Sequence, residues 1–224
     1  MKNKITQIQK QLLQICQIYH RDNVQLLAVS KGQSAEAIRA AYELGLKQFG
    51  ENYLQEALTK MQRLQDLKIE WHFIGKIQRN KTKLIAEHFS FVHSLDDEII
   101  AQRLNQQRPD NLAPLSVCIQ VNLDNEESKS GLLLQAVEPF LAEISSYSKL
   151  NCRGLMVIPK ATNDIKKQRS NFSKAHEYFL LLKEKGYDLD TLSMGMSADY
   201  EAAIAEGATI IRLGTAIFGE RRQA

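Results

Sequence analysis

The sequence has little of what marks secreted, metal-stapled or membrane-spanning proteins. Its 224 residues include only 3 cysteines, and no run of apolar residues exceeds about five. Cys16, Cys118 and Cys152 stand apart without a CxxC pair, so we expect free thiols, no disulfide framework and no metal site. A bilayer span needs about 20 apolar residues, and the first residues lack the pattern of a secretory signal. We therefore expect a cytoplasmic protein with no membrane segment.

Glycine and proline are scarce as well, and neither sign of charge is in large excess. With 11 glycines, 4 prolines, 44% hydrophobic and 25% charged residues, the composition excludes collagen-like, low-complexity and disordered chains. Lys and Arg number 29 and Asp and Glu 26, which leaves a net charge of only +3. The densest basic stretch, Lys166-Lys167-Gln168-Arg169, is interpreted as the solvated start of a helix, because nucleic-acid sites cluster basic and aromatic residues. We expect no nucleic-acid partner.

What the sequence does contain is a regular alternation of short apolar runs and longer amphipathic stretches. The apolar runs predict strands over Val24–Ser30, Lys47–Phe49, Ile69–Ile74, Ser90–His93, Leu115–Val121, Cys152–Ile158, Thr191–Ser193 and Thr209–Leu213. The amphipathic stretches predict a leading helix over Ile5–Tyr19 and further helices over Ala35–Leu44, Tyr53–Leu67, Arg79–His88, Asp97–Gln107, Leu132–Ser145, Ser170–Lys185 and Asp199–Glu206.

The order of these elements predicts the fold. Eight strands that alternate with helices indicate a parallel sheet, and eight is the number that closes a (β/α)8 barrel. Gly45, Gly186 and Gly207 each separate a predicted helix from the next strand, where a left-handed residue ends the helix. An open doubly wound sheet is the alternative, because a sequence does not reveal closure. We predict an α/β fold in which residues 1–224 form one (β/α)8 barrel domain with an additional N-terminal helix.

The first candidate for chemistry is Lys31, which follows the first predicted strand. Ligands of both architectures bind beyond the C-terminal ends of the strands. Because side chains alternate along a strand, Lys31 shares a face with Leu27 and Val29. If that face points into the barrel, burial disfavours the ammonium ion and leaves the neutral amine that a Schiff base requires. The alternative is an exposed lysine that opens a loop.

The second candidate is the pair of loops after the seventh and eighth predicted strands, which in many barrels build a phosphate site. Ser197, Gly214 and Thr215 supply hydroxyl donors, close backbone approach and N–H groups at the start of a helix. Asp199 lies beside them, so its carboxylate would have to point away. The alternative is an ordinary capped helix followed by a glycine turn.

Arg212 is the third candidate. It shares strand parity with Ala208 and Ile210, which predicts an inward side chain at the top of the eighth strand. A buried guanidinium needs a partner, either a carboxylate of the protein in a structural ion pair or an acceptor on a ligand. An inward lysine, a phosphate site and an inward arginine together suit a phosphorylated aldehyde, such as pyridoxal phosphate (PLP) or an aldose phosphate.

Longer strings of residues along the whole chain resemble the sequences of a known protein family. They are Leu27–Lys31, Phe49–Glu56, Trp71–Lys81, His93–Asp96, Gln120–Asn122, Ser128–Gly131, Gly154–Met156, Leu192–Ser197 with Asp199, and Arg212–Gly219. In this order they resemble the pyridoxal phosphate homeostasis protein family, the PLP-binding proteins of the alanine racemase N-terminal-domain type.

The resemblance implies a single (β/α)8 barrel that holds PLP at its C-terminal mouth. By motif position, Lys31 would form the Schiff base, and Ser197, Gly214 and Thr215 would hold the phosphate.

By the same motif positions, Arg212 would face the pyridine nitrogen and Asn52 would lie near the ring. A cation opposite that nitrogen keeps it unprotonated and weakens the cofactor as an electron sink. His72 and Met156 also occur in the matching strings and are interpreted as core or cavity wall.

These implications favour a carrier over an enzyme. The related alanine racemase adds a β-rich domain that supplies a tyrosine base, and we expect no such domain in a sequence that ends at Ala224. The hypothesis is that the protein binds PLP on Lys31, buffers it and delivers it to PLP-dependent apo-enzymes without turning over amino acids. The alternatives are a PLP-dependent amino-acid racemase and a cofactor-free class I aldolase-type phosphosugar enzyme.

Overall fold

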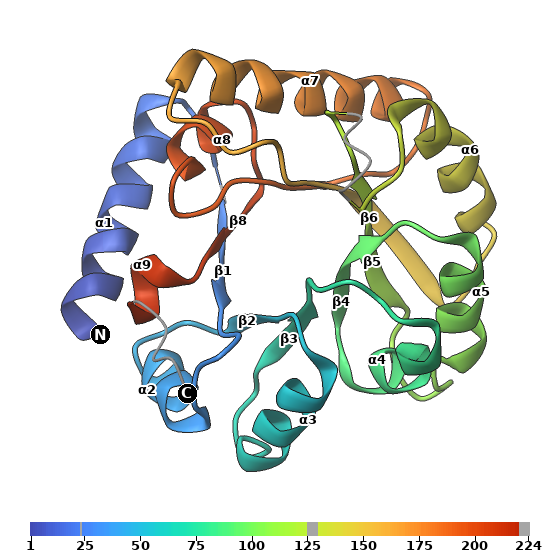
Figure 1. Cartoon of the computed structure of the whole chain (residues 1–224), viewed down its shortest axis with the longest axis horizontal. Helices are drawn as coiled ribbons and strands as arrows, with labels where there is room; N and C mark the ends of the chain where they lie inside the picture. Colours follow the sequence, from blue (N-terminus) through green and yellow to red (C-terminus); the bar gives the residue numbers. More distant parts are fainter. Residues whose placement is uncertain (23, 125–129, 220–224) are drawn as a thin grey trace.

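Eight parallel strands form a closed barrel in the computed structural model, which describes residues 1–22, 24–124 and 130–219 (Figure 1). The strands are β1 (Gln25–Val29), β2 (Gln48–Glu51), β3 (Glu70–Phe73), β4 (Phe91–Leu95), β5 (Leu115–Val121), β6 (Leu150–Val157), β7 (Thr191–Ser193) and β8 (Ile210–Leu213). Each strand pairs with the next in parallel, and β8 pairs with β1. Closure confirms the predicted barrel and rules out the open doubly wound sheet.

Helices surround the barrel on its outside (Figure 1). They are α1 (Lys2–Ile18), α2 (Ala35–Glu43), α3 (Leu54–Arg63), α4 (Thr82–His88), α5 (Glu98–Gln107), α6 (Leu134–Ile144), α7 (Ile165–Glu184), α8 (Tyr200–Ala205), α9 (Thr215–Phe218) and the 3-10 helix η1 (Arg79–Lys81). Within the described ranges, no helix combines the length and apolar character needed to cross a bilayer.

The N-terminal helix α1 packs against α8 and α9 with one apolar stripe. Ile5, Ile8, Leu12 and Ile15 are its buried residues, and their spacing of three and four positions places them on one face. The additional N-terminal helix predicted from the sequence is therefore confirmed.

The strands separate two apolar clusters, one between the sheet and the helices and one inside the barrel. Ala28 belongs to the outer cluster, whereas its neighbour Leu27 belongs to the inner one with Phe91, Cys118 and Met156. Because side chains alternate along β1, the face of Leu27 points into the barrel. The predicted inward parity of the residues before Lys31 is confirmed.

Several local predictions are confirmed and others are corrected. Gly45, Gly186 and Gly207 end their helices with φ of +99°, +95° and +94°. The basic stretch from Lys166 lies in the first turns of α7, but this helix begins at Ile165 rather than at Ser170.

The sequence Ser94–Asp97 is compatible with a capping box at the start of a helix, but the structure does not form one. Asp97 caps α5, because its Oδ1 accepts a hydrogen bond from the N–H of Ile100. Ser94 lies in β4, where its hydroxyl donates instead to the carbonyl of Gly75. Ser128 and Lys129 of the matching strings lie outside the described residues.

Candidate functional site

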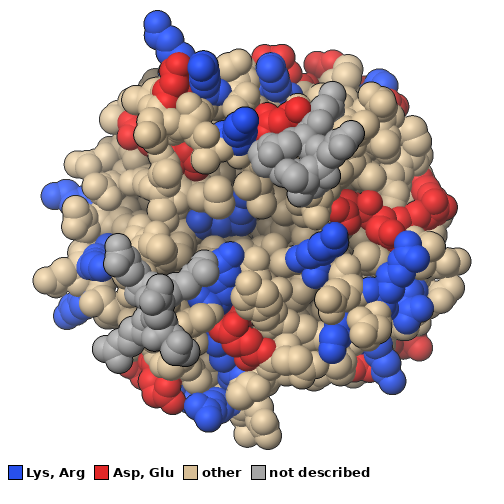
Figure 2. Space-filling view, in the orientation of Figure 1, with Lys and Arg blue, Asp and Glu red and all other residues tan. Residues whose placement is uncertain are grey.

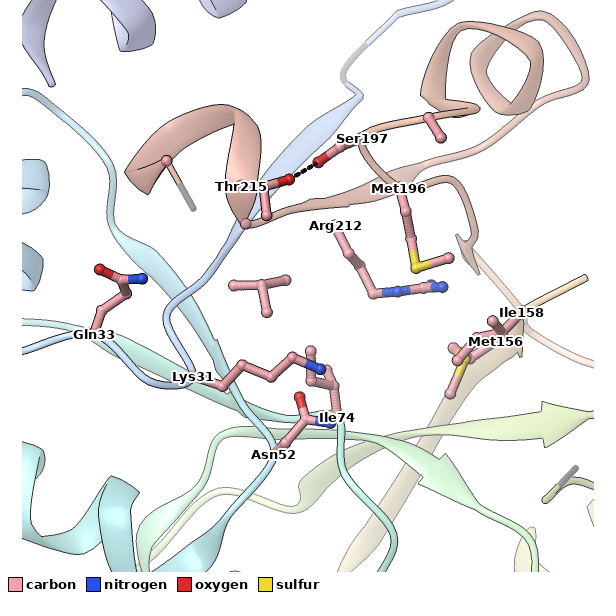
Figure 3. A pocket seen from close by; sticks show the side chains of 14 residues that line it. Lys31, Gln33, Asn52, Ile74, Met156, Ile158, Met196, Ser197, Arg212 and Thr215 are labelled. Carbon is pink, nitrogen blue, oxygen red and sulfur yellow. Dashed lines mark hydrogen bonds between the residues drawn. The ribbon is translucent and has the colours of Figure 1, made fainter. Parts of the chain in front are cut away.

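A cavity of about 340 Å³ opens at the C-terminal ends of the strands. Its lining includes all the site residues predicted from the sequence, namely Lys31, Asn52, Ser197, Arg212, Gly214 and Thr215. Figure 2 shows basic side chains within the hollow at the centre of this face, and Figure 3 shows the side chains that line the cavity. Residues far apart in the sequence therefore meet at one mouth, as a barrel requires.

Lys31 continues the inward face of β1 and is half-buried. Its side chain extends into the cavity, which Asn52 also lines (Figure 3). The peptide groups on either side of it are held by α3. The ammonium of Lys60 donates to the carbonyl of Ser30 over 2.7 Å, and the N–H of Gly32 donates to Glu56 Oε1 over 2.6 Å. Lys31 thus lies in the turn after β1, and its half-buried side chain lines the cavity.

These contacts belong to a buried ionic cluster beneath Lys31. Lys60 Nζ lies 2.7 Å from Glu51 Oε1 and 2.5 Å from Glu56 Oε1, and the hydroxyl of Ser30 donates to Glu51 over 2.6 Å. Burial raises the pKa of Glu51, and the neighbouring charge of Lys60 opposes this shift. Sequence reasoning missed the cluster, although Glu56 and Lys60 are four residues apart on one helix face.

Asn52 follows β2 and presents a polar atom that the protein does not satisfy. Its Oδ1 is buried and has no hydrogen-bond partner in the part of the chain that the structure describes. Because buried carbonyl oxygens are almost always hydrogen-bonded, this atom is suited to a donor on a bound molecule.

Arg212 is buried at the cavity wall, with 4% of its surface exposed. It donates to the carbonyl and the hydroxyl of Ser193 over 2.7 and 2.8 Å, and to the carbonyl of Val157 over 3.0 Å. Burial lowers the pKa of Arg212 to about 10, while the charge of Asp199 opposes the shift, so the guanidinium remains charged at neutral pH. Oxygens of β6 and β7, rather than a carboxylate, accept these hydrogen bonds.

The two loops predicted to hold phosphate lie next to each other at the mouth. The hydroxyl of Thr215 donates to Ser197 Oγ over 3.3 Å, and both side chains are exposed to the cavity (Figure 3). Gly214 packs closely on β1, because a Cβ there would lie 3.2 Å from the carbonyl oxygen of Val29. Asp199 faces away as expected: its Oδ1 accepts from the N–H of Met196 over 2.6 Å, and it does not line this cavity.

The rest of the lining is largely apolar. Met156 forms part of the wall and His72 is fully buried among the strands, so their interpretation as wall and core is confirmed. Ile74, Ile158 and Met196 were not singled out from the sequence, since an apolar residue after a strand carries no local signal for a cavity. Together they form a wall suited to the faces of a flat ring.

Comparison with known proteins shows the family of this chain. Residues 4–222 match the family described as "Alanine racemase, N-terminal domain". The pyridoxal phosphate homeostasis protein of Pseudomonas aeruginosa is 50% identical over 219 residues, which cover 97% of this chain and 94% of that protein. The chain belongs to the pyridoxal phosphate homeostasis protein family. The resemblance drawn from the sequence is therefore confirmed.

Solved structures agree on the fold. PipY of Synechococcus elongatus PCC7942, solved with PLP bound, is 36% identical and superposes with a TM-score of 0.87 over 97% of this chain and 99% of PipY. An alanine racemase of Clostridium difficile 630 superposes with a TM-score of 0.73 at 12% identity, over 94% of this chain and 59% of the racemase. At that identity the racemase shares the barrel fold alone.

Proposed function

We propose that the cavity binds pyridoxal 5′-phosphate and that the protein acts in PLP homeostasis by buffering the cofactor and delivering it to PLP-dependent apo-enzymes. The relatives named for this role and the PLP-bound PipY structure support the proposal. The observation that carries it is the placement of Lys31 and the Ser197–Thr215 pair on one cavity.

The residues of the cavity fit this cofactor. The buried Oδ1 of Asn52 requires a donor, and the close packing of Gly214 on β1 places the start of α9 at the wall of the cavity. The hydroxyls of Ser197 and Thr215 are hydrogen-bond donors for the phosphate oxygens. Arg212 is held at the cavity wall by Ser193 and Val157, where its charge would face the ring nitrogen of a bound cofactor.

Lys31 would supply the amine that holds the cofactor. When bound, PLP supplies an aldehyde that condenses with an amine and releases one water molecule. The contacts of Lys60 and Glu56 with the flanking peptide groups fix the direction of the Lys31 side chain. Because hydrolysis reverses the condensation, the same amine can release the cofactor to a recipient.

The lining favours binding over racemisation. A two-base racemase needs a second acid or base beside the lysine. Among the described residues that line the cavity there is no Tyr, His, Cys, Asp or Glu. Lys31 and Arg212 are the titratable side chains of this lining, and the charge of Arg212 suits it to hold the ring nitrogen unprotonated.

The absorption spectrum of the purified protein tests the proposal. We expect a visible band from the bound cofactor, and borohydride reduction followed by peptide mapping should place the adduct on Lys31. Lys31→Ala should abolish the band and leave the fold intact, whereas Lys174→Ala, at an exposed position of α7, should retain it.

Other outcomes would contradict the proposal in defined ways. A reducible adduct at the wild-type level in Lys31→Ala would place the anchor on another lysine. A colourless protein that is trapped by borohydride only when an aldose phosphate is added would indicate the aldolase-type enzyme. Interconversion of amino-acid enantiomers by the loaded protein would indicate a racemase.

A further inference from the structure

A line of polar side chains crosses the barrel interior from the cavity to the opposite ends of the strands. Arg212 donates to Ser193 Oγ over 2.8 Å, and this oxygen lies 2.9 Å from His93 Nδ1. His93 Nε2 lies 2.9 Å from His72 Nδ1. His72 Nε2 lies 3.2 Å from Glu70 Oε1, in a less well aligned contact. We refer to these five side chains as the Arg212–Glu70 relay.

The side chains of the relay come from four strands, and the middle of the relay is buried. Arg212 lies on β8, Ser193 on β7, His93 on β4, and His72 and Glu70 on β3. The middle three side chains are fully buried, whereas 45% of the Glu70 side chain is exposed at the far end. The relay therefore connects solvent at the beginning of β3 with the wall of the cavity.

The two ends of the relay, a guanidinium that only donates and a carboxylate that only accepts, are compatible with one direction of hydrogen bonding throughout. A guanidinium only donates, so the Ser193 hydroxyl accepts from Arg212 and can direct its own hydrogen to His93 Nδ1. A neutral His93 then carries its proton on Nε2 and donates to His72 Nδ1. His72 in turn has its proton on Nε2, which faces the Glu70 carboxylate. This tautomer assignment follows from the network.

The electrostatics agree with a neutral His93. Burial holds the pKa of His93 well below its usual range, and the positive charge of Arg212 acts in the same direction. The contact with the His72 ring lowers the pKa of Glu70, so this end of the relay is a carboxylate at neutral pH. The charged groups that act on this chain of contacts are Arg212, which acts on His93, and Glu70 with Arg153 beside it at the far end.

We propose that the Arg212–Glu70 relay fixes the Arg212 guanidinium at the cavity wall and transmits the negative charge of Glu70 to it, with His93 as the positioning residue. A fixed row of aligned dipoles between a cation and an anion strengthens both ends in a low-dielectric interior. The charge state at the far end of the barrel therefore sets the electrostatic environment of the ring in the cavity. This last consequence rests on the proposed PLP function, whereas the relay itself does not.

The first test needs no cofactor. Nitrogen-15 NMR of the histidine side chains should find His93 neutral, with its proton on Nε2, at pH 7. Ser193→Ala should shift the Nδ1 resonance of His93, because the hydroxyl donor is lost. A proton on Nδ1 of His93, a charged His93, or a resonance unmoved by Ser193→Ala would overturn the relay.

The second test measures how changes in the relay affect the absorption of bound PLP. The absorption band of bound PLP changes when the cofactor is titrated. In the PLP-loaded protein, Glu70→Gln should shift the pH midpoint of this titration by about half a pH unit. His72→Asn should move it by a similar amount, because the amide oxygen still accepts from His93 but no donor faces Glu70. Glu184→Gln makes the same charge change at an exposed position of α7 and should leave the midpoint unchanged.

The two tests separate the two claims. Wild-type midpoints in both Glu70→Gln and His72→Asn would overturn the transmission of charge. A protein that binds no PLP would overturn the proposed function, and the histidine NMR would still decide the relay. Glu70 is exposed at one end of β3, so its variant keeps the fold and the second test does not depend on a core substitution.

Discussion

The ammonium of Lys60 lies 2.7 Å from the backbone carbonyl of Ser30, the residue that precedes Lys31. A buried cation on α3 thus holds the peptide that directs the lysine of the cavity. The same ammonium contacts two carboxylates, those of Glu51 and Glu56. The direction of Lys31 therefore depends on a side chain that never reaches the cavity.

Lys60→Met should destabilise the protein strongly. The change leaves the buried Glu51 without its cation, and breaking a buried pair from one side costs about 3–5 kcal/mol. Denaturant unfolding at pH 7 measures this loss. The double variant Lys60→Met/Glu51→Gln removes both charges and should recover a large part of it. A single variant with wild-type stability would contradict the buried ion pair.

Glu51→Gln should change how stability depends on pH. The folded state raises the pKa of Glu51, so the folded protein binds this proton more tightly than the unfolded chain. Glu51 therefore stabilises the wild type at acid pH, and this contribution is lost as pH rises from the ordinary value of 4.5 through the raised pKa.

The variant lacks this contribution. Its free energy of unfolding minus that of the wild type should increase as pH rises from 4.5 to neutrality. Urea titrations of both proteins at several pH values measure the difference. A difference that stays flat or falls with pH would mean that the Glu51 pKa is not raised.

Ser197→Ala and Thr215→Val should each weaken PLP binding about tenfold, because each removes one hydroxyl donor to a charged phosphate. Both side chains are exposed, so the stability of the protein should not change. Pyridoxal, which lacks the phosphate, provides the control ligand and should bind both variants like the wild type. If pyridoxal binding weakened equally, these hydroxyls would contact the ring instead.

Gly195→Ala should destabilise the loop that carries Ser197. Gly195 has φ of +93°, and a Cβ there would lie 2.6 Å from the Cβ of Ala203. Strain and overlap together should cost about 1–3 kcal/mol and weaken PLP binding. Gly45→Ala is a matched control, since φ is +99° and no atom lies within 4 Å of the added carbon. Equal effects of the two variants would show that overlap at Gly195 is relieved by the loop.

Side-chain parity and strand order were sufficient to predict much of the site. The inward face of Leu27 follows from alternation along one strand, and the position of the Ser197 and Thr215 loops follows from the C-terminal mouth of a barrel. Both inferences use local sequence with one rule of topology, which explains why they agree with the structure.

Features that depend on packing between distant elements were not predictable. The predicted second strand ended at Phe49, whereas β2 continues to Glu51. Glycine followed by glutamate reads as a loop, but Gly50 packs against Leu27 and Glu51 is paired with Lys60. Helix α9 spans only Thr215–Phe218, which is too short for a helical period to be recognised.

The pairing of Leu27 with Arg212 joins the first strand to the last, and the cavity lies across this seam. A chain emerging from the ribosome could not complete the cavity until residues beyond Thr215 had been synthesised, although Lys31 is made early. A ligand that contacts residues of both β1 and β8 would hold the first and last strands of the barrel together. Ligand occupancy would then stabilise the pairing of β1 with β8, and the protease resistance of these two strands would rise together.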